Sequence, residues 1–99
     1  MIAYAFHPLA SAELRDAARY YDDQRSGLGT SFLREVRACI KQLRTHPGIG
    51  TLVAEQVRRR GLKRFPYNLI YLHEPNQLTN LAVMHQRRRP DYWRDRINL

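Results

Sequence analysis

The sequence has 99 residues, of which 43% are hydrophobic and 26% charged, and this balance excludes an intrinsically disordered chain. A chain of this length can bury one continuous core but not two, so we expect a single domain over residues 1–99. The formal net charge of +8 suits a nucleic acid or an acidic protein as partner. Residues 55–99 hold ten of the seventeen basic side chains against four acidic ones, so most of the charge lies in the second half.

The sequence contains one cysteine, Cys39, which excludes an internal disulfide framework and is compatible with a reducing compartment. Pro8 and Glu13 interrupt the apolar start, so it does not resemble a signal peptide, and no apolar run has the length of a membrane span. We therefore expect a soluble cytoplasmic protein that does not associate with membranes.

The first half of the chain predicts a strand followed by two helices. Residues 2–6 (IAYAF) are short and aromatic-rich, as in a strand, and Pro8 suits the first turn of a helix. In residues 9–24 the apolar side chains recur at steps of three and four, with Glu13, Arg15, Asp16 and Arg19 on the opposite, polar side. A similar pattern follows residues 27–29 (Gly-Leu-Gly), which we interpret as a turn rather than a phosphate-binding loop, and it ends at residues 46–48.

The second half predicts three strands. They are residues 53–60 (VAEQVRRR), residues 62–73 (LKRFPYNLIYLH) and residues 78–85 (LTNLAVMH), with a turn at residues 74–77. The nearly continuous apolar character of residues 78–85 is typical of a strand buried on both faces. The expected fold is α+β with the order β-α-α-β-β-β: a helical hairpin packed on a small, mostly antiparallel sheet, followed by a short C-terminal tail.

Three motifs in this order resemble the RelE/ParE superfamily, the toxins of bacterial type II toxin–antitoxin systems. They are YYDDQRSGLGTSFLREV at residues 20–36, RFPYNLIY at residues 64–71 and AVMHQRRRPDYW at residues 82–93. The resemblance covers essentially the whole chain and implies one of two activities on a shared fold. RelE-like members cut messenger RNA on the ribosome, whereas ParE-like members poison DNA gyrase and are not nucleases. Asn68 stands where RNA-cutting members often carry arginine, and this favours the ParE-like branch.

The RelE-like alternative is a metal-independent endoribonuclease in which the ribose 2′-hydroxyl attacks the neighbouring phosphate. Such a reaction needs a base, cations for the charged transition state and an acid for the leaving oxygen. The sequence offers Arg87 and Lys63 as phosphate clamps, His85 or Glu55 as the base, and Tyr92 as a stacking or proton-donating group. The resemblance implies matches by position for Arg87, Tyr92 and Lys63 only. No cofactor is implied, and the four histidines lack the spacing of a metal site. A weaker third hypothesis is a basic nucleic-acid-binding module without toxicity.

Each of these residues also has a purely structural interpretation. His85 suits a hydrogen-bonded residue at the end of a strand, and Tyr92 and Trp93 suit packing of the tail onto the sheet. The arginine run at residues 87–89 is compatible with a solvated surface. Cys39 lies on the apolar stripe of its helix, as a core residue would.

The resemblance also implies a partner, an acidic antitoxin that forms a hetero-oligomer with this chain. We expect a disordered, amphipathic antitoxin segment to fold on binding, with its apolar side on the helical hairpin and sheet edge and its carboxylates on the arginines. In an extended strand Arg58 and Arg60 share one side and Arg59 lies on the other. The residues expected to bind the antitoxin or the toxic target, gyrase or alternatively the ribosome with its messenger RNA, are Arg58, Arg60, Arg64, Arg87, Arg88, Arg89, Tyr92 and Trp93.

Overall fold

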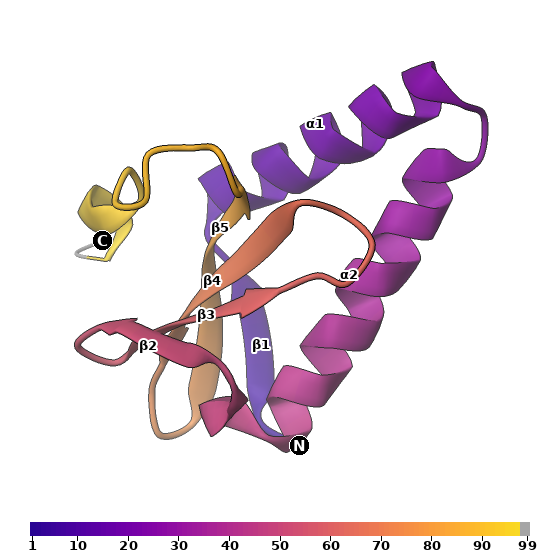
Figure 1. Cartoon of the computed structure of the whole chain (residues 1–99). Helices are drawn as coiled ribbons and strands as arrows, with labels where there is room; N and C mark the ends of the chain where they lie inside the picture. Colours follow the sequence, from indigo (N-terminus) through magenta and orange to yellow (C-terminus); the bar gives the residue numbers. More distant parts are fainter. Residues whose placement is uncertain (98–99) are drawn as a thin grey trace.

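A helical hairpin lies on one face of a five-stranded sheet in the computed structural model, which describes residues 1–97 (Figure 1). The hairpin consists of α1 (Pro8–Gln24) and α2 (Leu28–Thr45), and it follows the first strand, β1 (Ala3–Phe6). The remaining elements are the 3-10 helix η1 (Pro47–Ile49), β2 (Thr51–Ala54), β3 (Val57–Gly61), β4 (Tyr67–His73), β5 (Gln77–His85) and the 3-10 helix η2 (Arg94–Arg96).

The sheet has the strand order β1-β5-β4-β3-β2, in which β1 runs parallel to β5 and all other neighbours are antiparallel. The predicted α+β class and the mostly antiparallel sheet are therefore confirmed. The strand count differs, because residues 53–60 form two strands joined by a tight turn at Glu55 and Gln56. Gln56 has a φ of 62°, the left-handed conformation that this turn requires. The usual glycine or asparagine signal of such a turn is missing here, so alternation alone suggested one strand.

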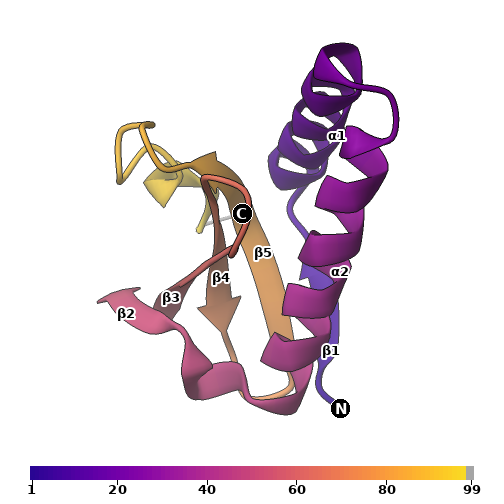
Figure 2. The ribbon, with the colours of Figure 1, turned by 45° about the vertical axis from the view of Figure 1, so that its right-hand side comes forward.

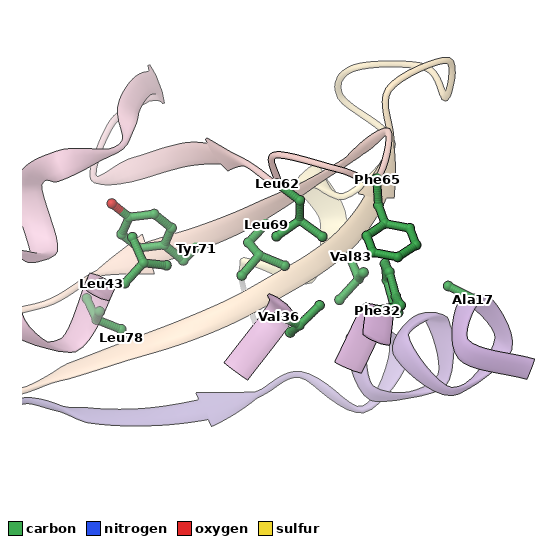
Figure 3. Packing of buried hydrophobic residues seen from close by; sticks show 10 residues of the cluster. All are labelled: Ala17, Phe32, Val36, Leu43, Leu62, Phe65, Leu69, Tyr71, Leu78 and Val83. Carbon is green, nitrogen blue, oxygen red and sulfur yellow. The ribbon is translucent and has the colours of Figure 1, made fainter. Parts of the chain in front are cut away.

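A second difference concerns the segment before β4, which begins at Tyr67 rather than at Leu62. Residues 62–66 form the connection between β3 and β4, and Pro66 has no N–H with which to extend a strand. Leu62 N–H donates to Tyr67 O at 2.9 Å and closes this hairpin. The loop consequently brings Phe65 back over the helices instead of extending the sheet (Figure 3).

The two helices approach each other most closely at their connection. Gly27 has a φ of 90°, and the N–H of Gly29 donates to Asp22 Oδ1 at 2.7 Å. A Cβ on Gly29 would lie 2.3 Å from the carbonyl oxygen of Ala18, so only glycine fits between the helices. The glycines of this turn thus fix how the hairpin closes, as a turn rather than a phosphate loop.

The main core fills the space between the hairpin and the sheet (Figures 2 and 3). Its fully buried members include Phe32, Leu43 and Leu69, and aromatic rings of Tyr21, Phe32, Phe65 and Tyr67 meet edge to face. Tyr71 closes one end of this core. Its hydroxyl donates to Pro47 O at 2.7 Å and accepts from Gly50 N–H at 3.0 Å, and it thereby fixes the path from α2 into β2.

A second core lies on the opposite face of the sheet, where the C-terminal tail crosses β4 and β5 (Figures 1 and 2). It contains Val57, Ile70, Leu81, Ala82, Met84 and Trp93. Trp93 is only 2% exposed, and its indole N–H donates to Pro90 O at 2.7 Å. This confirms that Trp93 packs the tail onto the sheet and that β5 is buried on both faces. Trp93 therefore contributes no exposed aromatic surface.

The close approach at Gly29 makes a clear prediction about stability. Gly29→Ala should lower the free energy of unfolding by about 1–3 kcal/mol, because the added methyl collides with backbone that cannot move independently. Gly48→Ala is the matched control, since a Cβ there meets nothing within 4 Å and stability should be unchanged or slightly raised. Urea denaturation of both variants measures the difference. Equal stabilities would contradict the interpretation of the turn.

Candidate functional site

The arginine run at residues 87–89 follows β5 after one intervening residue, Gln86, and lies on the surface. Arg88 is positioned by an aromatic contact, with its guanidinium carbon 4.0 Å from the centre of the Tyr92 ring. Arg89 forms an exposed ion pair with Asp91 at 3.4 Å, and Arg87 N–H donates to His85 Nδ1 at 3.0 Å. Backbone turns and one aromatic ring therefore hold this basic segment in place, while its charged groups stay accessible.

Glu13 of α1 holds the rest of the tail. Its carboxylate accepts the Tyr92 hydroxyl at 2.8 Å and two hydrogen bonds from Arg96, each at 3.0 Å. The side chains of Arg96 and Glu13 are 9% and 17% exposed, so water screens this ion pair only weakly. Sequence reasoning placed Glu13 on the solvent side of its helix, and this was wrong. Its partners are about 80 residues away, and such a contact leaves no trace in helical spacing.

The same ion pair also completes the edge of β5. Strand β1 pairs only with residues 77–80, so the backbone of β5 beyond this point lacks a neighbouring strand on that side. The Glu13 carboxylate accepts the N–H of Val83 at 3.0 Å, and the Arg96 guanidinium donates to the carbonyl of Leu81 at 2.9 Å. Beyond the end of β1, the two side chains therefore replace the neighbouring strand. They satisfy backbone groups of β5 that would otherwise be buried without partners.

The Tyr92 hydroxyl is fixed as a hydrogen-bond donor. Burial, followed by the hydrogen bond to the negative Glu13, raises the pKa of Tyr92 far above its ordinary value. The phenol therefore keeps its proton throughout the physiological range. A proton-donating role at a substrate would require Tyr92 to leave the Glu13 carboxylate.

The arginines of β3 alternate between the faces of the sheet as predicted. Arg58 donates to Gly50 O at 2.8 Å and Arg60 donates to Gln42 Oε1 of α2 at 3.2 Å, so both lie on the helix side. Arg59 is exposed and lies beside Ile70 and Trp93 on the opposite face. Arg58 and Arg60 thus make local structural contacts, and Arg60 also lines a hollow together with Gln86, the residue before the arginine run.

Glu35 of α2 is a second anchor that sequence reasoning missed. Its carboxylate accepts the backbone N–H groups of Lys63 and, at 3.1 Å, Arg64, and it forms an ion pair with the Arg64 side chain at 3.4 Å. These contacts join the β3–β4 loop to α2. They also form one wall of a shallow hollow lined by Ala38, Cys39, Gln42, Arg60 and Lys63.

The residues proposed for RNA cleavage occupy different surroundings. Lys63 lies beside α2, Tyr92 is hydrogen-bonded to α1, and Glu55 is exposed in the β2–β3 turn. His85 uses its Nδ1 to accept the Arg87 N–H, and its ring contacts the edge of Tyr67 at 5.1 Å between ring centres. The hydrogen-bonded structural interpretation of His85 therefore has direct support.

Within residues 1–97 the structure contains no cluster of three or more histidine, cysteine or acidic side chains that could hold a metal ion. In the same part of the chain, neither of the long helices is apolar enough to span a membrane. The candidate functional site is therefore the exposed arginine run of the tail, together with the Glu13 carboxylate that holds the tail in place.

A family model for the ParE toxin of the type II toxin–antitoxin system parDE matches residues 4–90. The chain belongs to the ParE toxin family. Among solved structures, it resembles a chain of the chromosomal ParDE toxin–antitoxin system from P. aeruginosa with a TM-score of 0.74. The two are 17% identical over 86% of this chain and 96% of that chain, so this likeness shows a shared fold. Among curated protein sequences, none matches this ParE family member.

The match confirms the resemblance to ParE, and it covers most of the chain but ends before the last part of the tail. Residues 4–90 include both helices, all five strands save Ala3, and the arginine run. The Glu13 side chain lies within the match, whereas its partners Tyr92 and Arg96 lie beyond it. The residues that anchor the end of the tail therefore lie outside the matched range.

The Glu13 anchor should be important for stability. Glu13→Gln removes the charge opposite the nearly buried Arg96, so we expect the free energy of unfolding to fall by roughly 3 kcal/mol. Asp16→Asn on the same helix is the control, because its ion pair with Arg19 is largely exposed and should contribute less than about 0.5 kcal/mol. Chemical denaturation compares the two, and similar small effects would show that the anchor is dispensable.

The thiol of Cys39 should be unreactive in the folded protein. Burial raises its pKa from 9.0 to about 11, although the nearby Arg60 charge opposes the rise. At pH 8 the thiolate population is therefore about a hundredfold lower than in the unfolded chain, and alkylation should slow accordingly. Reactivity should recover as the pH approaches 11. Iodoacetamide labelling with and without urea measures this, and equal rates would contradict the burial of the thiol.

Proposed function

We propose that this ParE family member is a cytoplasmic toxin that stops growth by inhibiting DNA gyrase and that a cognate antitoxin neutralises it. The observation that carries the proposal is the engagement of Tyr92 by Glu13 in a chain whose residues 4–90 match the ParE model. A nuclease needs its acid and cations free and close together. Here the phenol is committed to a structural carboxylate, and Lys63 lies beside another helix.

The arginine run is the surface that we assign to the toxic target. Arg87, Arg88 and Arg89 are exposed on a tail that is fixed at both ends, by β5 on one side and by Trp93 and Arg96 on the other. A rigid segment loses little conformational freedom on binding, and arginines over an aromatic ring are frequent in interface hot spots. Tyr92 contributes through its ring, on which the Arg88 guanidinium stacks.

The antitoxin is the second partner in this proposal. Leu9 and Tyr20, both on α1, are 53% and 57% exposed and offer apolar anchors on the hairpin. A net charge of +8 attracts an acidic segment over long distances, whereas the apolar contacts hold it once bound. The expected product is a hetero-oligomer in which part of the basic surface is covered.

Gyrase inhibition can be tested with purified enzyme. We expect wild-type protein to block supercoiling of relaxed plasmid, and a variant with Arg87, Arg88 and Arg89 all changed to alanine to need at least about tenfold more protein. The matched control changes Arg15, Arg34 and Arg37, three exposed arginines of the hairpin, to alanine and removes the same charge. If both triple variants inhibit like wild type, the tail is not the target surface.

A translation assay separates the proposal from the RelE-like alternative. Messenger RNA on translating ribosomes should remain intact when this protein is added at concentrations that block gyrase. Cleavage in the ribosomal A site that is lost in Arg87→Ala, together with normal supercoiling, would overturn the gyrase proposal and establish the endoribonuclease.

The charge on the toxin should control how fast the antitoxin binds. Raising salt from low to physiological levels should reduce the association rate much more than it increases the dissociation rate, because screening acts on the approach of the partners. Stopped-flow fluorescence measures both rates. A salt-independent association rate would show that the arginine surface does not guide the antitoxin.

A further inference from the structure

The sheet has two edge strands, β1 and β2, and they differ in how well they are protected (Figure 1). Native proteins usually shield an edge with charged side chains, proline or a bulge, because its free backbone groups can pair with another strand. Strand β2 has such a feature, because its register with β3 shifts between Leu52 and Ala54. Strand β1 has none of these, and residues 1–12 contain no acidic or basic side chain apart from His7.

The hydrogen bonds at either end of β1 show which backbone groups face outward. His7 N–H donates to Asn80 O of β5 at 2.9 Å, so in an extended strand Ala3 and Ala5 also face β5. The backbone N–H and C=O groups of residues 2, 4 and 6 then point away from β5, toward the free edge. Ile2 confirms this direction, because its N–H donates to Arg44 O at 3.4 Å and its carbonyl accepts from Arg44 Nε at 2.7 Å.

Arg44 at the end of α2 thus forms hydrogen bonds with the outward N–H and C=O groups of Ile2. Within residues 1–97, no hydrogen bond engages the outward N–H and C=O groups of Tyr4 and Phe6. These four groups have the spacing that an added strand would use. The open part of the edge therefore begins directly after the part that Arg44 closes.

The side chains around this edge also suit an extended apolar partner. Ala3 and Ala5 are exposed but too small to obstruct a neighbouring strand. Met1 and Leu9, 74% and 53% exposed, flank the strand at its two ends and are among the most exposed large hydrophobic side chains of the described chain. An incoming segment would gain main-chain hydrogen bonds along the middle and apolar contacts at both ends.

We propose that the free edge of β1 binds an extended segment of the antitoxin, which pairs with Tyr4 and Phe6 and extends the sheet beyond β1. This inference rests on the proposed function, since it takes an antitoxin as the occupant. A second copy of the toxin is a poorer occupant, because each copy carries a net charge of +8 and two such copies repel each other. An acidic chain with alternating apolar residues would be attracted by the net charge of the toxin and could pair with the free backbone groups of β1.

Amide hydrogen exchange gives a residue-by-residue test. The probe is the small acidic protein that we expect to be encoded beside the toxin gene, purified in complex with the full-length toxin. In the free toxin, Ala5 and His7 should be protected by β5, whereas Tyr4 and Phe6 exchange freely. In the complex, Tyr4 and Phe6 should become at least about a hundredfold slower, which turns an alternating pattern into a continuous one.

A pair of edge variants tests the same idea by affinity. Ala5→Glu places a carboxylate beside the incoming acidic segment and should weaken antitoxin binding about tenfold or more, and Leu52→Glu on the opposite edge should leave it unchanged. Both variants should still inhibit gyrase like wild type, which shows that they are folded. Isothermal titration calorimetry measures the dissociation constants.

The outcomes distinguish this inference from the function on which it rests. If the toxin and the acidic protein form no complex, the proposed antitoxin partnership fails. If the complex forms but Tyr4 and Phe6 exchange as in the free toxin, or if both edge variants bind alike, the antitoxin binds elsewhere and the inference is overturned. Protection of Tyr4 and Phe6 in concentrated toxin alone would overturn it too, in favour of self-association.

Discussion

The carboxylate of Glu13 is the point at which α1, β5 and the tail meet. It neutralises Arg96, accepts the Tyr92 hydroxyl and satisfies the Val83 N–H, so one side chain joins three elements that are far apart in the sequence. The basic segment at residues 87–89 lies between β5 and this anchor, and both hold it in position. The exposed charge of the toxin is therefore presented by a part of the chain that is itself held by a nearly buried ion pair.

Much of the fold could be predicted because it depends on local periodicity. The apolar spacing of α1 and α2, the glycines between them and the continuous apolar run of β5 all identified their elements, and the resemblance to ParE followed from the same segments. The hairpin of β2 and β3 was missed because Gln56 adopts a positive φ without being glycine or asparagine. A turn of that kind is imposed by the surrounding sheet rather than by its own residues.

The site was harder to predict because its main contacts are long-range. Arginines 87–89 could be found as a charge run, and the alternation of Arg58 and Arg60 followed from strand geometry. Glu13 was assigned to the polar side of its helix and Glu35 was not singled out, since nothing in a helical pattern says which polar residue another segment will cover. Only the packed structure assigns these two carboxylates to the tail and to the β3–β4 loop.

The parallel pairing of β1 with β5 has a consequence for the order of folding. Residues 3–6 must wait for residues 77–80, and Glu13 must wait for Arg96, so these contacts close very long loops. The helical hairpin and the meander of β3, β4 and β5 involve only short separations and can form earlier. We therefore expect the first strand and the tail to be the last parts of the molecule to gain their native contacts, and both make those contacts with β5.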